Sequence, residues 1–195
     1  MIMDSEVENA VKRGDTVYLD KHVNASNIEA VNAQSQSMLM MATYQDNYDL
    51  ASFLVKKGAD PNQQDEQLNS PFLYAGASGY LDMVKLYLAY GARFDVFNRY
   101  HGTALIPAAE KGHIEVVRLL AKTKNFPINH VNKLGWTALM EAIVLGNGGK
   151  DHVEIVSILL KAGADPNIPD KDGVLPIEHA KQKGFSEIVE ILQLH

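Results

Sequence analysis

Apolar residues recur along this chain as pairs of short helical stripes, separated by glycine and by polar loops. The clearest example is the segment 101–120, where one stripe begins at Leu105 and another covers residues 114–120. Thr103 predicts an N-cap for the first helix, because its hydroxyl can accept from N–H groups that lack partners at a helix start. Gly112 predicts the turn between the two helices. Helices shorter than about 12 residues are marginal alone in water, so this pair must bury its apolar faces against neighbours.

The same two-helix pattern is written several times in the sequence. A Ser or Thr opens each copy, a Leu or Phe follows two residues later, and an Ala follows five residues later. The copies are Ser37/Leu39/Ala42, Ser70/Phe72/Ala75, Thr103/Leu105/Ala108, Thr137/Leu139/Ala142 and a degraded Leu175/Ile177/Ala180. Their opening residues lie 33, 33, 34 and 38 positions apart. The turns expected between the two helices of each copy are at Asp46, Gly79, Gly112, Gly146 and Gly184. Self-similarity at such a period is typical of stacked repeats.

This order of signals resembles the ankyrin repeat over roughly the whole chain. The segments that carry the resemblance are Ser70-Pro71-Phe72-Leu73, Thr103-Ala104-Leu105, Gly112-His113 and Gly163-Ala164-Asp165-Pro166-Asn167. The resemblance implies an all-α ankyrin-repeat solenoid of about six helix-turn-helix units with short β-hairpin-like fingers. We expect a single domain over residues 1–195, with an N-terminal capping repeat (1–35), four central repeats (36–168) and a C-terminal capping repeat (169–195).

Three features depart from the family pattern. Ankyrin repeats usually carry a histidine three residues after the opening residue, and this chain has Met40, Leu73, Ile106, Met140 and Glu178 there. We therefore expect mostly apolar contact between neighbouring repeats at this position. Pro107 lacks an N–H near the start of a first helix and predicts a local kink. Residues 147–151 are an insertion between two helices and predict a flexible surface loop.

Composition narrows the class of partner. The net charge of -6 argues against nucleic acid, because phosphate binding needs clustered Lys and Arg. No window approaches the 18 apolar residues of a membrane span, and the first residues lack the apolar run of a signal peptide. We expect a cytoplasmic monomer, with a periplasmic or secreted protein as the alternative if a leader was removed. By resemblance alone, the amino-acid sequences of the repeats are typical of bacterial ankyrin proteins.

The sequence offers little chemistry for catalysis. The chain has no Cys, and the segment 146–150 has neither the spacing nor the Ser or Thr of a phosphate-binding loop. His113 and His152 occupy the same position of successive repeats. We therefore interpret them as structural residues of the repeat and not as catalytic or metal-binding residues. We therefore predict no cofactor, no metal site and no catalytic residue. An enzyme that uses Glu141, Glu178 and His179 is the alternative, and it requires an enclosed cleft beside them.

What remains is a surface for protein binding. In ankyrin repeats the finger tips and the exposed positions of the first helices line a concave face, and aromatic residues and Arg are favoured at hot spots. The partner-binding residues that we predict are Tyr44, Glu66, Gln67, Tyr74, Arg99, Tyr100, Lys133, Leu134, Trp136 and Leu145. For Trp136, packing across the neighbouring finger is an open alternative.

We predict a non-enzymatic protein–protein interaction module whose partner is another protein. The alternative is a dedicated inhibitor or stabiliser of one enzyme. That alternative rests on acidic residues expected at the finger tips, since complementary charge raises association rates. These acidic residues are Asp65, Glu66, Asp170 and Asp172.

Overall fold

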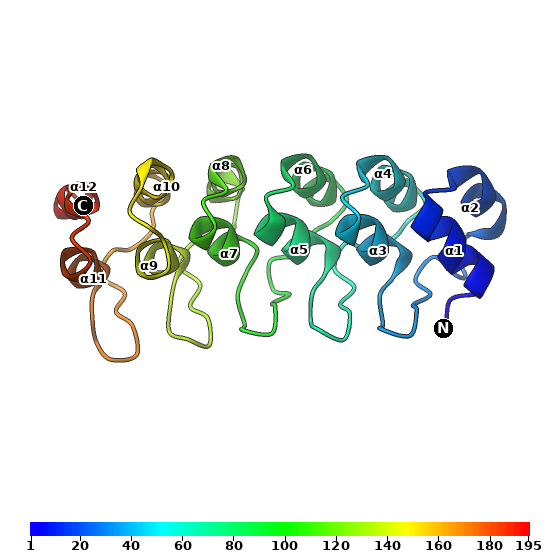
Figure 1. Ribbon diagram of the computed structural model, residues 1–195, viewed down its shortest axis with the longest axis horizontal. Coiled ribbons are helices and arrows are strands. Elements are labelled where there is room, and N and C mark those ends of the chain that lie inside the picture. The colour runs from blue at the N-terminus through cyan, green and yellow to red at the C-terminus, as the bar shows by residue number, and fades with distance from the viewer. The chain divides into compact units, whose positions relative to one another are not determined.

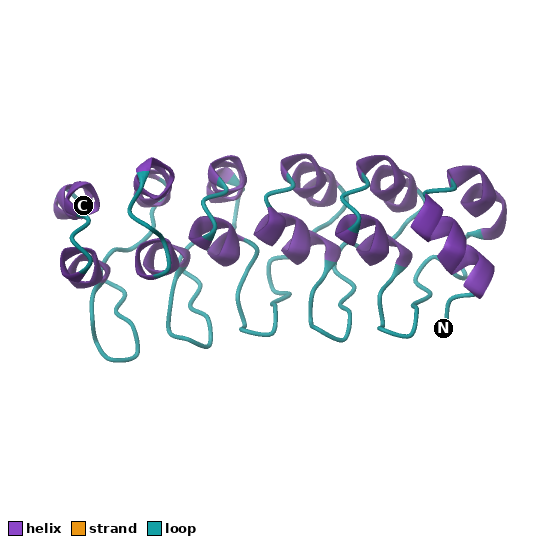
Figure 2. Cartoon of the chain, viewed as in Figure 1, coloured by secondary structure: helices purple, strands orange, loops and turns teal.

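The computed structural model describes residues 1–195, which form twelve α-helices. Figure 2 shows these helices joined by loops, with no strand. The first helices of the six pairs are α1 (Ser5–Arg13), α3 (Met38–Tyr44), α5 (Pro71–Ser78), α7 (Leu105–Glu110), α9 (Ala138–Val144) and α11 (Pro176–Gln182). The second helices are α2 (Thr16–His22), α4 (Tyr48–Lys56), α6 (Leu81–Ala89), α8 (Ile114–Lys122), α10 (Lys150–Lys161) and α12 (Ser186–Gln193). None of these helices is both long and apolar enough to cross a bilayer.

The helix pairs form two compact units, residues 1–75 with 80–99 and residues 76–79 with 100–195. Within the first unit α1 packs on α3, and α4 packs on α6. Within the second unit α7, α9 and α11 pack in succession, and α10 lies between α8 and α12 (Figure 1). In each unit the loops that precede the first helices project from the side that those helices occupy (Figure 1). We call these loops the fingers.

The repeated apolar positions form the core, as their spacing predicts. The Leu or Phe and the Ala of the four clear copies are buried: Leu39, Ala42, Phe72, Ala75, Leu105, Ala108, Leu139 and Ala142. Ile177 of the degraded copy is only half-buried, while Ala180 is fully buried. At the position where the family usually has histidine, four residues are apolar and buried, as expected: Met40, Leu73, Ile106 and Met140.

Polar coupling between repeats nevertheless exists, at a different position. His152 is buried, and its Nε2 lies 2.7 Å from the carbonyl oxygen of Glu110 in the preceding repeat. One repeat earlier the equivalent carbonyl is that of Ala77, which is a hydrogen-bond partner of His113 and also accepts from Lys111 Nζ at 3.0 Å. His152 therefore has a structural role, in keeping with its repetition at the slot of His113.

The predicted N-cap at Thr103 is wrong. The equivalent Ser37 and Thr137 each accept from the backbone N–H three residues on, at 3.1 Å. Thr103 Oγ1 is buried without any hydrogen-bond partner, and α7 begins only at Leu105. Pro107 gives the physical reason, because it lacks an N–H for the carbonyl of Thr103 and its ring crowds that carbonyl. The proline shortens the first turn where a kink was expected.

The insertion at residues 147–151 is only partly a loop. Lys150 and Asp151 belong to α10, which has 12 residues where α4, α6 and α8 have 9. The turn expected at Gly146 also moves, since the left-handed glycine is Gly148, with φ of 68°. A Cβ at Gly148 would lie 2.4 Å from Phe185 Cδ1. The insertion thus extends a helix and packs against the last repeat.

Candidate protein-binding surface

An Asp or Asn at a fixed place closes each of four fingers. Its side-chain oxygen accepts from the backbone N–H groups two and four residues on, at 2.9–3.1 Å: Asn32, Asp65, Asn132 and Asp170. Asn98 stands at the same place in a fifth finger. In all five fingers the residue three positions after this Asp or Asn has a left-handed conformation: Ser35, Leu68, His101, Gly135 and Gly173. Side-chain oxygens that replace backbone partners make tight turns of defined conformation. The tips are therefore held by local bonds and present their side chains outward.

The finger tips of the second unit expose large apolar side chains. Tyr100 is 49% exposed and Leu134 is 44% exposed. The two fingers are joined by a hydrogen bond of 2.8 Å from the N–H of Lys133, itself exposed, to the carbonyl of Tyr100. Trp136 is half-buried. Leu145, directly after α9, is 47% exposed.

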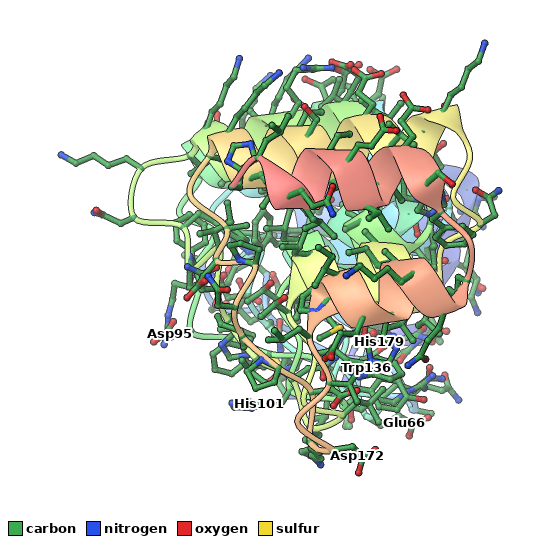
Figure 3. The ribbon with its side chains drawn as sticks, turned by 90° about the vertical axis from the view of Figure 1, so that its left-hand side faces the viewer. Glu66, Asp95, His101, Trp136, Asp172 and His179 are labelled. Atoms are coloured by element: carbon green, nitrogen blue, oxygen red, sulfur yellow. The ribbon has the colours of Figure 1, made fainter.

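Figure 3 separates the two sides of these fingers. Trp136 and His179 lie on one side of the finger loops, below the first helices, and His101 lies on the other side (Figure 3). Asp172 lies at the tip of the last finger (Figure 3). Trp136 therefore shares a side with the exposed face of the first helices, as a residue of a common binding surface should.

In the first unit, two predicted residues form a cluster that supports a finger. Tyr44 donates from Oη to Asp65 Oδ2 at 2.6 Å and accepts from Asn69 Nδ2 at 3.1 Å. Its ring meets that of Tyr74 edge-on, with centroids 4.5 Å apart. Burial and the bond to Asp65 raise the pKa of the Tyr44 phenol far above its usual range. Tyr44 and Tyr74 are half-buried, whereas the predicted Glu66, Gln67 and Arg99 are exposed.

The sequence prediction missed Leu68, at the tip of the same finger as Glu66 and Gln67. Its side chain is 45% exposed, and its φ of 59° is left-handed. A left-handed conformation costs roughly 1–2 kcal/mol for a residue with a Cβ, and the equivalent fingers have glycine at positions 135 and 173. The available signal was the alignment of the tips, which places Leu68 where other copies use glycine.

Two of the acidic residues expected at the finger tips form side-chain hydrogen bonds within the fold and are not available to a partner. Asp65 is buried and accepts from Tyr44. Asp170 Oδ2 accepts from His179 Nε2 at 2.7 Å, and the pKa of Asp170 is lowered by the N–H of Val174 and by His179. Only Glu66 and Asp172 remain exposed. The charge expected at the finger tips is thus smaller than the sequence indicates.

The three residues of the enzymatic alternative are held in separate local hydrogen bonds. Glu178 is exposed and accepts from the N–H of Leu175 at 2.8 Å, as in a capping box. His179 is bound to Asp170. An open hollow lies at the C-terminal helix pair, but none of the three residues of this alternative lines it: its walls are Lys181, Gly184, Phe185, Ser186, Val189 and Glu190.

Glu141, on α9, is a buried acidic residue. Its side chain is only 5% exposed, and Asn132 Nδ2 donates to Oε1 at 2.8 Å. Burial, and then the negative charge of Glu110, raise the pKa of Glu141 to about 7. The fold therefore keeps a carboxyl group in an unfavourable position between the first helices and the fingers.

Comparison with known proteins agrees with this architecture. A family model described as ankyrin repeats (3 copies) matches residues 72–170 and 126–195, and a second, ankyrin repeats (many copies), matches residues 39–86. The chain belongs to the ankyrin repeat family. Ankyrin repeats are generally protein–protein interaction modules, and the family is generally non-catalytic.

Two similar ankyrin proteins are bacterial. The chain is 35% identical over 165 residues to the putative ankyrin repeat protein YahD of Escherichia coli, covering 85% of this chain and 82% of YahD. A solved ankyrin repeat domain of Acinetobacter baumannii is 47% identical, with a TM-score of 0.89 over 95% of this chain and 94% of that one. The solved ankyrin repeat protein EF0377 is 34% identical, with a TM-score of 0.93 over the whole of both chains.

One shorter match concerns a protein named for inhibition. The chain is 35% identical over 94 residues to cyclin-dependent kinase inhibitor 2A of Monodelphis domestica. That alignment covers 48% of this chain and 51% of the inhibitor.

Proposed function

We propose that this ankyrin repeat chain binds a partner protein through its fingers and the adjoining face of the first helices. The observation that carries the proposal is the exposure of large apolar side chains on turns of defined conformation, at Leu68, Tyr100 and Leu134. Exposure of large apolar side chains to water is unfavourable, so such groups commonly mark a protein-binding site. Aromatic side chains on a rigid turn also lose little conformational entropy when a partner binds. The proposed surface has a part in each unit. The part in the first unit is Tyr44, Glu66, Gln67, Leu68, Tyr74 and Arg99, and the part in the second unit is Tyr100, Lys133, Leu134, Trp136 and Leu145.

The test is affinity capture from the native host lysate with two sets of variants. Combined replacement of Arg99, Tyr100 and Trp136 by Ala should abolish capture of the bound protein. The matched control replaces Tyr48 and Tyr90 by Ala. These two exposed tyrosines flank second helices, away from the fingers, and their removal should leave capture unchanged. Equal capture by the triple variant and the native chain, at equal thermal stability, would place the binding surface elsewhere.

A second candidate function is regulation of a single enzyme. The partial match to a cyclin-dependent kinase inhibitor and the exposed Glu66 and Asp172 favour it. Charge of this kind would raise the association rate at low ionic strength. Capture of one stoichiometric enzyme with a salt-dependent association rate supports a regulator, and capture of many unrelated proteins supports a general interaction module.

A further inference from the structure

The carboxyl group of Glu141 is buried but only half satisfied. Oε1 accepts from Asn132, whereas Oε2 accepts no hydrogen bond. Oε2 nevertheless keeps some contact with the surface. The buried side-chain atoms that have neither a partner nor access to the surface are Glu29 Oε2, Gln63 Oε1 and Thr103 Oγ1. A carboxylate has about four acceptor sites, so a donor that approaches from the surface still finds a free oxygen.

The fold itself does not require a charge at this position. Met41 and Tyr74 occupy the same place, four residues past the opening Ser, in two earlier repeats. His179 occupies it in the last repeat and is bound to Asp170. The bond between Asn132 and Glu141 supports a finger, as the bond between Asp170 and His179 does in the last repeat. The second oxygen of Glu141 has no such structural task, and a buried carboxylate that is only half satisfied costs stability, which indicates a role for that oxygen outside the packing of the repeats.

The surroundings of Glu141 are acidic and lack a cation. From α7, Glu110 adds a second carboxylate close enough to act on Glu141. The nearby basic groups are used elsewhere, since Lys111 donates to Ala77 and His179 to Asp170. Neither Glu110 nor Glu141 takes part in an ion pair within the chain.

Large apolar side chains adjoin Glu141 on α9. Trp136 directly precedes the N-cap Thr137, and Glu141 is the fourth residue of α9. Side chains at these two positions commonly contact each other at the start of a helix. Leu145 follows Glu141 by four residues, on the same side of α9, and is 47% exposed. A long basic side chain suits such a place, because its methylene stem packs on apolar groups while its charged end donates to carboxylates.

We infer that Glu141 and Glu110 receive a lysine or arginine side chain of the partner protein, in a segment with apolar residues beside the basic one. The inference rests on the proposed function and names the chemistry of the partner at one point of the surface. Arginine fits best, since its planar fork donates to a carboxylate with more than one N–H.

The test uses a phage-displayed library of random 12-residue peptides as the probe. The library is selected on the full native chain, on Glu141→Gln, and on the triple variant of Arg99, Tyr100 and Trp136. Peptides selected on the native chain should carry Lys or Arg at one fixed position, and this preference should be absent on Glu141→Gln. A selected peptide should bind Glu141→Gln at least tenfold more weakly, whereas Glu187→Gln, an exposed carboxylate on α12, should bind it as the native chain does.

A double-mutant comparison separates direct pairing from an indirect effect. Replacement of the basic residue of the peptide by Ala should weaken binding to the native chain tenfold and leave binding to Glu141→Gln unchanged. Binding should also release protons near pH 7, visible as a dependence of the binding enthalpy on the buffer, because a cation favours ionised Glu141. A merely structural role of Glu141 would produce neither result, and glutamine retains an oxygen for Asn132, so the variant should fold.

The possible outcomes distinguish a failure of the inference about Glu141 from a failure of the proposed finger surface. Peptides that are enriched on the native chain and lost on the triple variant, but that show no basic preference, overturn the inference and leave the finger surface intact. No enrichment on the native chain above the triple variant overturns both. Equal binding to the native chain and Glu141→Gln overturns the inference even if basic peptides are selected.

Discussion

Pro107→Ala should stabilise the protein, although proline is usually the more rigid residue. In three other repeats the residue at this position donates its N–H to the carbonyl of the opening residue, at 2.9 Å. The variant restores this bond, worth about 1 kcal/mol, and lets Thr103 cap the helix, worth about 1 kcal/mol more. The loss of proline's restriction of the unfolded chain subtracts about 0.4–1 kcal/mol. The net gain is about 1 kcal/mol.

The assay is urea unfolding followed by circular dichroism. With a slope of about 2 kcal/mol/M, the midpoint of Pro107→Ala should rise by about 0.5 M. Pro176→Ala is the matched control, because Pro176 is the first residue of α11, where its missing N–H costs nothing. That variant should lose stability, so the two replacements have opposite signs.

The hydroxyl of Thr103 gives an independent check. Thr103→Val should be neutral in the native chain, because the buried hydroxyl has no partner to lose. Thr137→Val should cost about 1 kcal/mol, since Thr137 caps α9. If Pro107→Ala were no more stable than the native chain, or Thr103→Val as costly as Thr137→Val, the account of α7 would be refuted.

Three further predictions concern the left-handed Leu68, the insertion at residues 147–151 and the buried carboxyl group of Glu141. Leu68→Gly should raise the unfolding free energy by about 1 kcal/mol, by relief of the left-handed strain, and weaken capture of the partner; a stability gain with unchanged capture would remove Leu68 from the surface. Gly148→Ala should lower the melting temperature clearly more than Gly163→Ala, because a Cβ at Gly148 meets Phe185 at 2.4 Å, while Gly163 has open space and φ of 95°; equal losses would contradict the packing of the insertion. For Glu141, whose pKa is raised in the folded chain, stability is highest below the unfolded value near 4.3 and falls as pH rises toward 7. Glu141→Gln should therefore match the native chain near pH 4 and exceed it at pH 8, by up to about 3 kcal/mol, in paired urea titrations; a constant difference across pH would contradict the shift.

The sequence was sufficient for the repeat architecture because the signals that specify it are local and repeated. The Ser or Thr, Leu and Ala of each copy predict the first helices, and the buried positions follow from their spacing. Where a copy departs from the pattern, one residue changes the outcome. Pro107 removes the cap at Thr103. The last two residues of the insertion extend α10, and Gly148 lies against Phe185.

The candidate surface was less predictable, because exposure depends on contacts between distant residues. Tyr44 bonds to Asp65 across 21 positions, so a tyrosine and an acid that both seemed available for a partner support a finger. Leu68 was missed because its position was not compared with that of Gly135 and Gly173 in the other fingers, although its exposed fraction could be known only from the structure. The depth of Glu141 likewise depends on how Asn132 folds back on α9.

The most direct test of the central claim is amide hydrogen exchange of the full chain with and without its captured partner. We predict slower exchange in the fingers around Asp65 and Asn132 and in the first helices that adjoin them, with α4, α8 and α12 unchanged. Slower exchange confined to the second helices, with the fingers unaffected, would contradict the proposal that this ankyrin chain binds through its finger surface.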